Sequence, residues 1–325
     1  MKAHDFIPFA RDCYRQRYEA QEIAWNTYSS ALSAFRAFER YCQSTQRETV
    51  EVDTELLSGY KQWCLAQGNK VITVNQKLIP LLQTLKKTDL PEEAQGIYFN
   101  LRPRRYGEEA TQSGEVNPGS VRYLSARQLE DLIALYGQMP EGWEKDCLDM
   151  FLFSFHACGL RISDIITLEW RHIDLAQATL AKVLVKTKTP ITIPLSAPAL
   201  EILGRWKDSS RNSRFVFDQL PVTFDLLDDA VLAQVTDSRN HAVRLTLNRI
   251  GRRLGLPFPL GMHVARHTFA VMALNSRNVN VHIISNLLGH SSVVVTEKVY
   301  AKFLLTTLST ELRQHLTFAE YSPKK

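Results

Sequence analysis

Apolar side chains recur every three or four residues through most of the first hundred positions. Between residues 22 and 45 this spacing places several of them on one face of a helix, at Tyr28, Leu32, Phe35 and Cys42. The pattern predicts three helices, at 22–45, 52–66 and 72–87. Pro80 falls inside the third helix and is expected to kink or shorten it. No alternating strand pattern interrupts this region, so a small helical bundle is predicted.

This periodicity disappears where the chain reads PRRYGEEATQSGEVNPGSVR. Gly, Pro, Ser and Glu dominate the stretch, and such a composition is typical of a linker. A chain of 325 residues is long enough for two domains. The predicted ranges are 1–102 for the helical domain, 103–122 for the linker and 123–325 for the second domain.

The second domain combines helical patterns with one strand pattern. Residues 178–196 alternate and are rich in β-branched side chains, with Lys-Thr-Lys-Thr-Pro at the middle, which predicts a strand, a turn and a strand. Helices are expected at 125–139, at 147–160, at 198–206, at 241–254 and over most of 264–316. Ser125 is the expected N-cap of the first, and residues 207–240 give only short, ambiguous runs. The predicted fold class is mainly α with a small β-sheet: a helical bundle followed by an α+β domain.

Composition narrows the setting of the protein. Apolar residues make up 45% of the chain, and no apolar run reaches the roughly 18 residues of a membrane span. The N-terminus lacks the apolar segment of a signal peptide, so a cytoplasmic protein without a membrane partner is expected. The five cysteines form no CxxC pair, which favours buried free thiols over disulfides or zinc ligands.

Positive charge points weakly to a polyanionic partner. The formal net charge is +5, and arginines cluster at 101–107, 211–214 and 248–255. Each cluster could equally be ordinary solvated surface.

Two segments carry cations in unusual places. Arg161 directly follows the buried helix at 147–160, and a guanidinium there needs an anionic partner. That partner could be Asp164 or Glu169 inside the fold, or a ligand. Lysines 186 and 188 occupy the predicted hairpin turn, where they serve either edge protection or function.

The densest group of reactive side chains lies between residues 263 and 300, in the stretch HVARHTFAVMALNSRNVNVHIISNLLGHSSVVVTEKVY. His263 and Arg266 are three apart, so they share one face of a helix, and His267 is expected to point partly elsewhere. His290 follows a glycine, and Tyr300 comes ten residues later. No HExxH zinc pattern, glycine-rich phosphate loop or evident carboxylate pair for magnesium accompanies them. Arginines, a lysine, histidines and a tyrosine together suit metal-free phosphoryl transfer on a phosphodiester.

Five segments, in this order, resemble the successive motifs of the tyrosine recombinases, the phage-integrase family: ACGLRISDIITLEW, KTKTPITIPL, HVARHTFA, LLGHSS and TEKVYAKF. The resemblance covers about residues 120 to 310. The N-terminal bundle resembles the DNA-clamping, core-binding domain of that family less specifically. Because the helical pattern begins almost at residue 5, we expect no separate arm-binding domain.

The resemblance implies a catalytic set of six residues: Arg161, Lys186, His263, Arg266, His290 and Tyr300. Tyr300 would attack a DNA phosphodiester to form a 3′-phosphotyrosine, while the two arginines hold the non-bridging oxygens. Lys186 would protonate the leaving 5′-oxygen, His263 would assist proton transfer at the tyrosine, and His290 would hydrogen-bond the phosphate. No cofactor or metal is implied.

One departure from the family pattern concerns the nucleophile. The interval from His290 to Tyr300 is one residue longer than is typical of the family, and on a helix this turns the tyrosine by about 100°. Tyr321 is the only later tyrosine, in surroundings that resemble a tail.

The resemblance also implies partners: double-stranded DNA, and self-association into a tetramer on DNA. Leucines spaced four apart predict a C-terminal helix for exchange between protomers, at 304, 308, 312 and 316. The helix could instead fold back on its own domain. Two rival functions stay open: a type IB-like topoisomerase or telomere resolvase, and a non-catalytic DNA-binding regulator. The sequence does not choose among integration, excision, inversion and dimer resolution.

Overall fold

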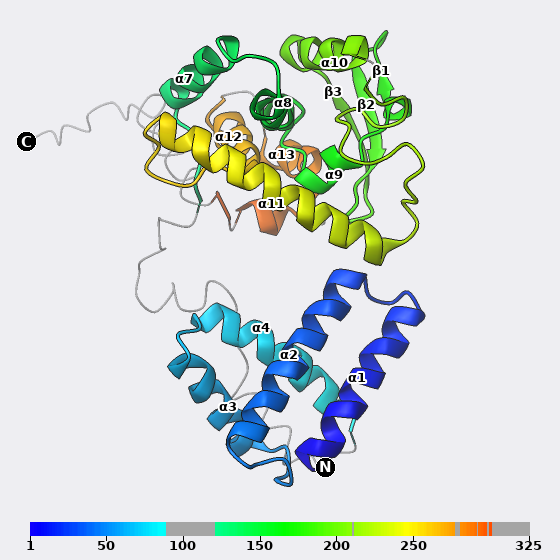
Figure 1. Ribbon diagram of the computed structural model, residues 1–325, viewed down its shortest axis with the longest axis vertical. Helices are drawn as coiled ribbons and strands as arrows, with labels where there is room; N and C mark the ends of the chain where they lie inside the picture. The colour runs from blue at the N-terminus through cyan, green and yellow to red at the C-terminus, as the bar shows by residue number, and fades with distance from the viewer. Residues whose placement is uncertain (89–120, 210, 277–279, 291, 298, 301–325) are drawn as a thin grey trace, which may run out of the picture. The chain divides into compact units, whose positions relative to one another are not determined.

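The computed structural model describes residues 1–88, 121–209, 211–276, 280–290, 292–297 and 299–300 (Figure 1). The chain divides into two compact units. Unit 1 comprises Met1–Asn117 with Asp229–Ala233, and unit 2 comprises Pro118–Asp228 with Gln234–Lys325. Most of the predicted linker lies outside the described residues, so the domain boundaries at 102 and 122 stay predictions.

Unit 1 contains four described helices packed around an aromatic core. They are α1 (Ala3–Glu19), α2 (Trp25–Ser44), α3 (Thr54–Ala66) and α4 (Val71–Leu85). Phe6, Phe38 and Tyr60 pack edge to face in the core. The three helices predicted at 22–45, 52–66 and 72–87 are confirmed. Pro80 does not end α4, which runs on to Leu85.

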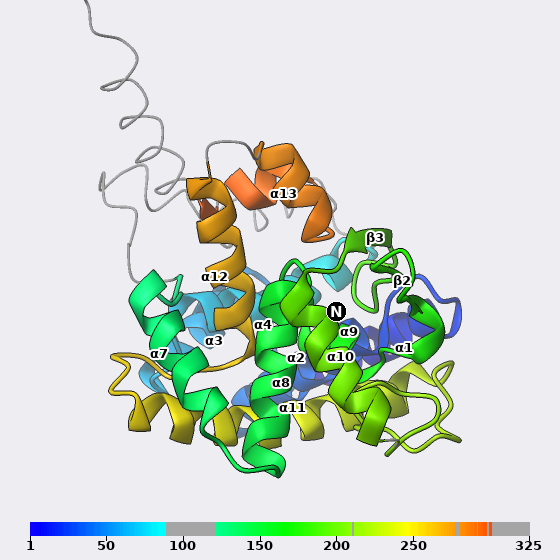
Figure 2. The same ribbon diagram turned by 90° about the horizontal axis from the view of Figure 1, so that it is seen from above.

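Unit 2 is built around α8 (Trp143–His156), whose residues from Cys147 to Ser154 are all buried. Figure 2 shows α8 between α7 and α10, and α8 also contacts α12. The remaining helices are α7 (Ala126–Gly137), α9 (Ile162–Ile166), α10 (Ala197–Ser209), α11 (Asp229–Arg253, in unit 2 from Gln234 onward), α12 (Met262–Asn275) and α13 (Val281–Leu287), with a 3₁₀ turn, η2 (Trp170–His172).

A three-stranded antiparallel sheet completes unit 2, in the order β1 (Ile173–Asp174), β2 (Thr179–Val183), β3 (Pro190–Pro194). The predicted strand–turn–strand at 178–196 is thus confirmed. In its register Leu180 pairs with Ile193 and Lys182 with Ile191. The two-residue β1 was not predicted, because a strand so short has no alternating pattern to reveal it.

Helix boundaries depart from the prediction where the burial pattern misleads. The helix expected at 147–160 ends at His156, because Cys158 and Gly159 have positive φ values that a helix cannot hold. The helix expected at 241–254 begins much earlier, at Asp229. The start was missed because the polar run at 236–241 separates a short apolar stretch at 230–235 from the periodic part of the helix. The predicted Ser125 N-cap is confirmed, as a capping box with Gln128.

All five cysteines are free thiols, and four of them are buried. Across the described part of the chain, no helix is long and apolar enough to cross a membrane. The C-terminal helix predicted beyond Tyr300 lies outside the described residues.

Candidate active site

Arg266 lies on α12 with its guanidinium buried, and backbone carbonyls fix its orientation. Nη1 donates to the carbonyl oxygen of Gly159 at 2.7 Å, and Nη2 donates to that of Leu288 at 2.6 Å. The same Nη2 lies 3.0 Å from Nε2 of His290. Burial, followed by the charge of Arg161, lowers the pKa of Arg266 to about 10, so the guanidinium stays charged at neutral pH.

The turn between α8 and α9 makes room for this arginine. Gly159 has φ +75°, and a Cβ there would lie 3.1 Å from Cγ and 3.2 Å from Cα of Arg266. A side chain would therefore meet both an unfavourable backbone conformation and the helix that carries Arg266. Glycine at this position lets α8, α9 and α12 meet at one point.

The hydrogen bonds of His290 identify its tautomer. Because Arg266 can only donate, Nε2 of His290 must accept, and the ring proton of a neutral His290 is then on Nδ1. Nδ1 lies 2.7 Å from Oγ1 of the buried Thr296 and donates to it. Burial lowers the pKa of His290 to about 4, aided by the charges of Arg266 and Arg161, so the ring is neutral at physiological pH.

Arg161 is the N-cap residue of α9 and is half-buried. Its Nη1 atom is buried without a hydrogen-bond partner among the described residues. Neither ion pair considered from the sequence forms: within the described residues Arg161 has no paired carboxylate, and Glu169 binds Arg171 and Arg214 instead. Burial lowers the pKa of Arg161. The side chain is therefore held in the fold with donor capacity left for an anion.

Asp164 is the carboxylate whose charge acts on Arg161, and it favours the charged guanidinium. It is fully buried, its Oδ1 accepts from the backbone N–H of Val185 at 2.7 Å, and its Oδ2 has no hydrogen-bond partner among the described residues. Burial raises the pKa of Asp164, and the charges of Lys182, Arg161 and Arg266 oppose that rise. The bond to Val185 ties α9 to the β2–β3 hairpin.

Lys186 and Lys188 are both exposed on the hairpin turn. The charge of Lys186 contributes to lowering the pKa of both His263 and His290. Lys188 has φ +54°, and its N–H donates to Leu184 to close the turn. Lys186 is thus the hairpin lysine whose charge acts on His263 and His290.

The two histidines at the start of α12 lie in different surroundings. His263 is exposed to solvent on one side. Partial desolvation by the protein on its other side, and then the charge of Arg266, lower its pKa. His267 is half-buried, and its Nδ1 lies 2.7 Å from the hydroxyl oxygen of Tyr300. Burial lowers the pKa of His267 to about 4. The ring centroids of the two histidines are 6.3 Å apart.

His267 is the residue that the sequence reasoning missed. It was expected to point partly away from the group, yet it is the histidine in contact with the tyrosine. Its spacing of four from His263 puts both rings on one helix face, and this was the available signal.

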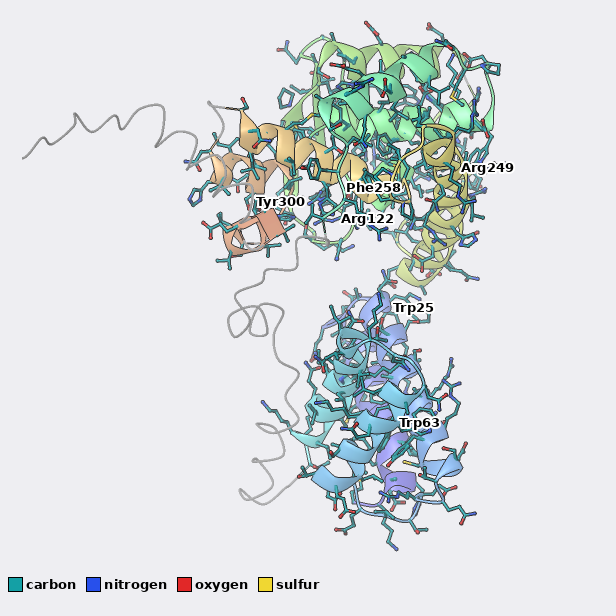
Figure 3. All side chains as sticks on the ribbon, turned by 90° about the vertical axis from the view of Figure 1, so that its left-hand side faces the viewer. Trp25, Trp63, Arg122, Arg249, Phe258 and Tyr300 are labelled. Carbon is teal, nitrogen blue, oxygen red and sulfur yellow. The ribbon has the colours of Figure 1, made fainter. Side chains whose placement is uncertain are left out.

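Tyr300 is 1% exposed and packs against α12 and α13. Figure 3 shows its side chain beside these orange helices, and Tyr300 forms one buried apolar cluster with Ala270, Leu274 and Ile284. Burial raises the pKa of Tyr300 to about 12, so the phenol is protonated at neutral pH. Because the hydroxyl lies 2.7 Å from His267 on α12, the longer interval from His290 does not carry it away from that helix. Tyr321 lies outside the described residues.

Some arginines of the sequence clusters have partners within the protein. Arg211 pairs with Asp146 at 2.7 Å, and Arg253 pairs with Glu144 at 2.9 Å. Arg214 bonds Glu169 and two backbone carbonyls. Cluster 211–214 is therefore largely structural, and cluster 101–107 lies outside the described residues. Over the described ranges, no three His, Cys, Asp or Glu side chains gather to hold a metal ion.

A helical domain with one small antiparallel sheet, gathering two arginines, histidines and a buried tyrosine, has the fold of integrases and recombinases. The Tn1549 transposon integrase in complex with transposon right end DNA shares it, with a TM-score of 0.64 and 14% identity over 97% of this chain and 99% of that one. The lambda integrase dimer bound to a COC′ core site has a TM-score of 0.56 and 17% identity, over 91% of this chain and 97% of that one. The XerH site-specific recombinase bound to difH substrate has a TM-score of 0.59 and 13% identity, over 83% of this chain and 74% of that one.

The chain belongs to the phage integrase family, whose model matches residues 122–304, more than half of the sequence. Tyrosine recombinase XerC of Ralstonia pickettii (strain 12J) is 27% identical over 54% of this chain and 56% of that protein. XerC of Chlorobaculum parvum is 30% identical over 44% of this chain and 41% of that protein. XerC of Actinobacillus pleuropneumoniae serotype 7 is 25% identical over 75% of this chain and 73% of that protein. The chain spans about half the length of the first two relatives. The predicted family and fold class are confirmed.

Proposed function

We propose that this protein is a site-specific DNA recombinase that cleaves and rejoins DNA through a 3′-phosphotyrosine intermediate. The observation that carries the proposal is the half-buried Arg161, whose buried Nη1 has no partner among the described residues and whose charge interacts with that of Arg266. Two arginines that repel each other while buried are costly unless an anion lies between them. A DNA phosphate is an anion that guanidinium groups bind through paired hydrogen bonds.

The first chemical step forms one bond and breaks one. The Tyr300 oxygen attacks the phosphorus, the bond to the 5′-oxygen breaks, and a 3′-phosphotyrosine and a free 5′-hydroxyl result. Arg161 and Arg266 stabilise the charge on the non-bridging oxygens, a role that metal ions have in other phosphoryl transfers. The 5′-hydroxyl of another strand then attacks the phosphotyrosine and releases the enzyme. The bond energy is kept in the intermediate, so the scheme needs no nucleotide cofactor.

Protons move at both ends of this step. Nδ1 of neutral His267 lies 2.7 Å from the Tyr300 hydroxyl, so the tautomer with its proton on Nε2 accepts this hydrogen bond and is placed to take the phenolic proton. His263 lies beside it and is exposed, so it can pass that proton to water. Lys186, a cation at the exposed hairpin turn, protonates the leaving 5′-oxygen. Both ring nitrogens of neutral His290 are engaged, Nε2 by Arg266 and Nδ1 by Thr296, so in this arrangement His290 orients Arg266 toward the phosphate.

Strand exchange is the property that tests this function. DNA flanking the gene should be searched for inverted or attachment-like repeats, and two duplexes carrying such a repeat should be incubated with the protein. We expect Holliday junctions and recombinant products from wild type and none from Tyr300→Phe, because the ring of that variant keeps its packing but lacks the attacking oxygen. Tyr321→Phe is the matched control and should recombine normally. Relaxation of supercoils without any exchanged strands would contradict the proposal.

A further inference from the structure

Strand β2 carries a charged residue in a row of buried positions. Leu180 and Lys182 in β2, and Leu184 just after it, are buried and alternate with exposed residues. Lys182 is only 8% exposed, and the alternating pattern would place an apolar side chain at that position. A buried ammonium is costly unless it makes contacts that an apolar side chain cannot.

The contacts of Lys182 all lead to helix α9. Its Nζ donates to Oγ1 of Thr167 at 2.8 Å and to the carbonyl oxygen of the same residue at 3.1 Å. Thr167 is the C-cap of α9, and Arg161 is the N-cap of the same five-residue helix. Among the described residues, Lys182 makes no direct ion pair, although Asp164 and Glu169 attract its charge from farther away. The ammonium therefore attaches β2 to the end of α9 opposite Arg161.

A second contact fastens the same hairpin to the same helix. The backbone N–H of Val185 donates to Oδ1 of Asp164, which lies within α9. The turn itself is closed by two backbone bonds, from Leu184 to Thr189 and from Lys188 to Leu184. Lys186 directly follows Val185, so its backbone starts from a point already fixed on α9. The hairpin thus has two polar attachments to α9, one from the end of β2 and one from the turn that follows it.

We propose that Lys182 is a positioning residue that sets the β2–β3 hairpin against α9, so that Lys186 and Arg161 reach the same phosphate. This inference rests on the proposed function, in which Lys186 protonates the leaving oxygen. Apolar packing of Leu180, Leu184, Ile191 and Ile193 holds the hairpin in the core, and the two polar contacts add a directional link between its turn end and α9. A general acid acts only within hydrogen-bond reach of its target, so a small displacement of Lys186 is enough to remove its contribution.

The test separates positioning of the acid from support of the fold. Single-turnover cleavage is measured on two nicked substrates that differ in one atom: an ordinary 5′-bridging oxygen, or a 5′-bridging sulfur whose thiolate leaves without a proton. Lys182→Met is expected to cleave the oxygen substrate about tenfold to a hundredfold more slowly than wild type. On the sulfur substrate it should match wild type. Lys186→Ala is the reference for complete loss of the acid, and Lys188→Ala, on the same turn, should behave as wild type.

Thr167→Val examines the same bond from its other side and leaves the buried lysine in place. It removes Oγ1 but keeps the carbonyl acceptor, so a smaller loss, again confined to the oxygen substrate, is expected. The double variant Lys182→Met/Thr167→Val should be no slower than Lys182→Met alone, because both changes break one interaction. Thermal unfolding and half-site binding are recorded for each variant. If Lys182→Met does not fold, Thr167→Val decides on the same two substrates.

Each outcome bears on one claim. Equal losses on both substrates, or wild-type rates on both by a folded variant, would overturn the positioning role. An oxygen-selective loss in Lys186→Ala that neither Lys182→Met nor Thr167→Val shows would overturn it too, while leaving the proposed function intact. Wild-type protein that forms no covalent product on either substrate would instead overturn the proposed function.

Discussion

Arg161 illustrates what a single residue reveals in the sequence and what it does not. Its position after a buried helix predicted that it needs an anionic partner, but two nearby carboxylates were equally plausible partners. The structure removes that ambiguity, because Glu169 binds Arg171 and Arg214 and no described carboxylate pairs with Arg161. Side-chain pairing of this kind depends on three-dimensional neighbours, so periodicity could not supply it.

Charge alone should not replace this arginine. We expect Arg161→Lys to be nearly as damaging to DNA cleavage as Arg161→Ala, because an ammonium keeps the charge but loses the planar fork that binds two phosphate oxygens. Initial rates on a nicked substrate measure the effect, and circular dichroism of both variants is the control. Unfolding of either variant would point to a structural role, and near-normal cleavage by Arg161→Lys would contradict the role of the fork.

The contact between His267 and Tyr300 leads to a second prediction at this scale. His267→Ala should slow cleavage by about a hundredfold or more, the usual contribution of a positioned base, and more than His263→Ala does. His267→Gln should fall between, because its amide can accept the hydrogen bond but cannot take the proton. Single-turnover rates on one substrate compare the three variants. A severe defect in His263→Ala beside a normal rate in His267→Ala would show that the observed contact is not used in catalysis.

At the scale of elements, the sequence predicted those with strong local signals. Alternation predicted the β2–β3 hairpin and Ser125 as an N-cap predicted the start of α7, and both are present. The two-residue β1 and the first half of α11, in which a polar run interrupts the apolar positions, carried no such signal. For the candidate site, five motifs named six residues, but the contact of His267 depends on how α12 packs beside Tyr300. That contact joins segments 33 residues apart, beyond the reach of a local pattern.

The turn between α8 and α9 gives a prediction with a matched control. Gly159 and Gly255 both have positive φ, but only a Cβ at Gly159 would meet Arg266, whereas nothing lies within 4 Å of one at Gly255. Each change to alanine should cost about 1–2 kcal/mol of unfolding free energy for the backbone conformation. Gly159→Ala should in addition slow cleavage, because it displaces Arg266. Denaturant unfolding and cleavage rates measure the two effects. Equal cleavage by the two variants would argue against this turn as the support of Arg266.

At the scale of the whole molecule, we propose that the protein is mainly monomeric in solution and forms a tetramer on two DNA duplexes. The leucine-spaced C-terminal segment supports this proposal, because its apolar stripe suits docking on a neighbouring protomer. A head-to-tail contact of that kind closes into a ring. Tyr300 immediately precedes the segment, so assembly and the position of the nucleophile would be coupled.

Truncation after Phe303 tests that assembly. The shortened protein should bind a single half-site as wild type does, but lose cooperative binding to a full site and strand exchange. Gel-shift titrations of half-site and full-site DNA measure both properties. Wild-type synapsis by the truncated protein would contradict the proposal. Insolubility at every concentration would favour the alternative, in which the helix folds back on its own domain.

The central claim is that the Tyr300 oxygen becomes covalently bound to DNA, and one measurement addresses it directly. Wild-type protein is incubated with a nicked substrate that loses its 5′-hydroxyl fragment on cleavage, and the adduct is digested with nuclease and protease. Mass spectrometry should then find the nucleotide-3′-phosphate on the peptide that contains Tyr300, and no adduct in Tyr300→Phe. The modification on Tyr321, or adducts that persist in Tyr300→Phe, would contradict the account.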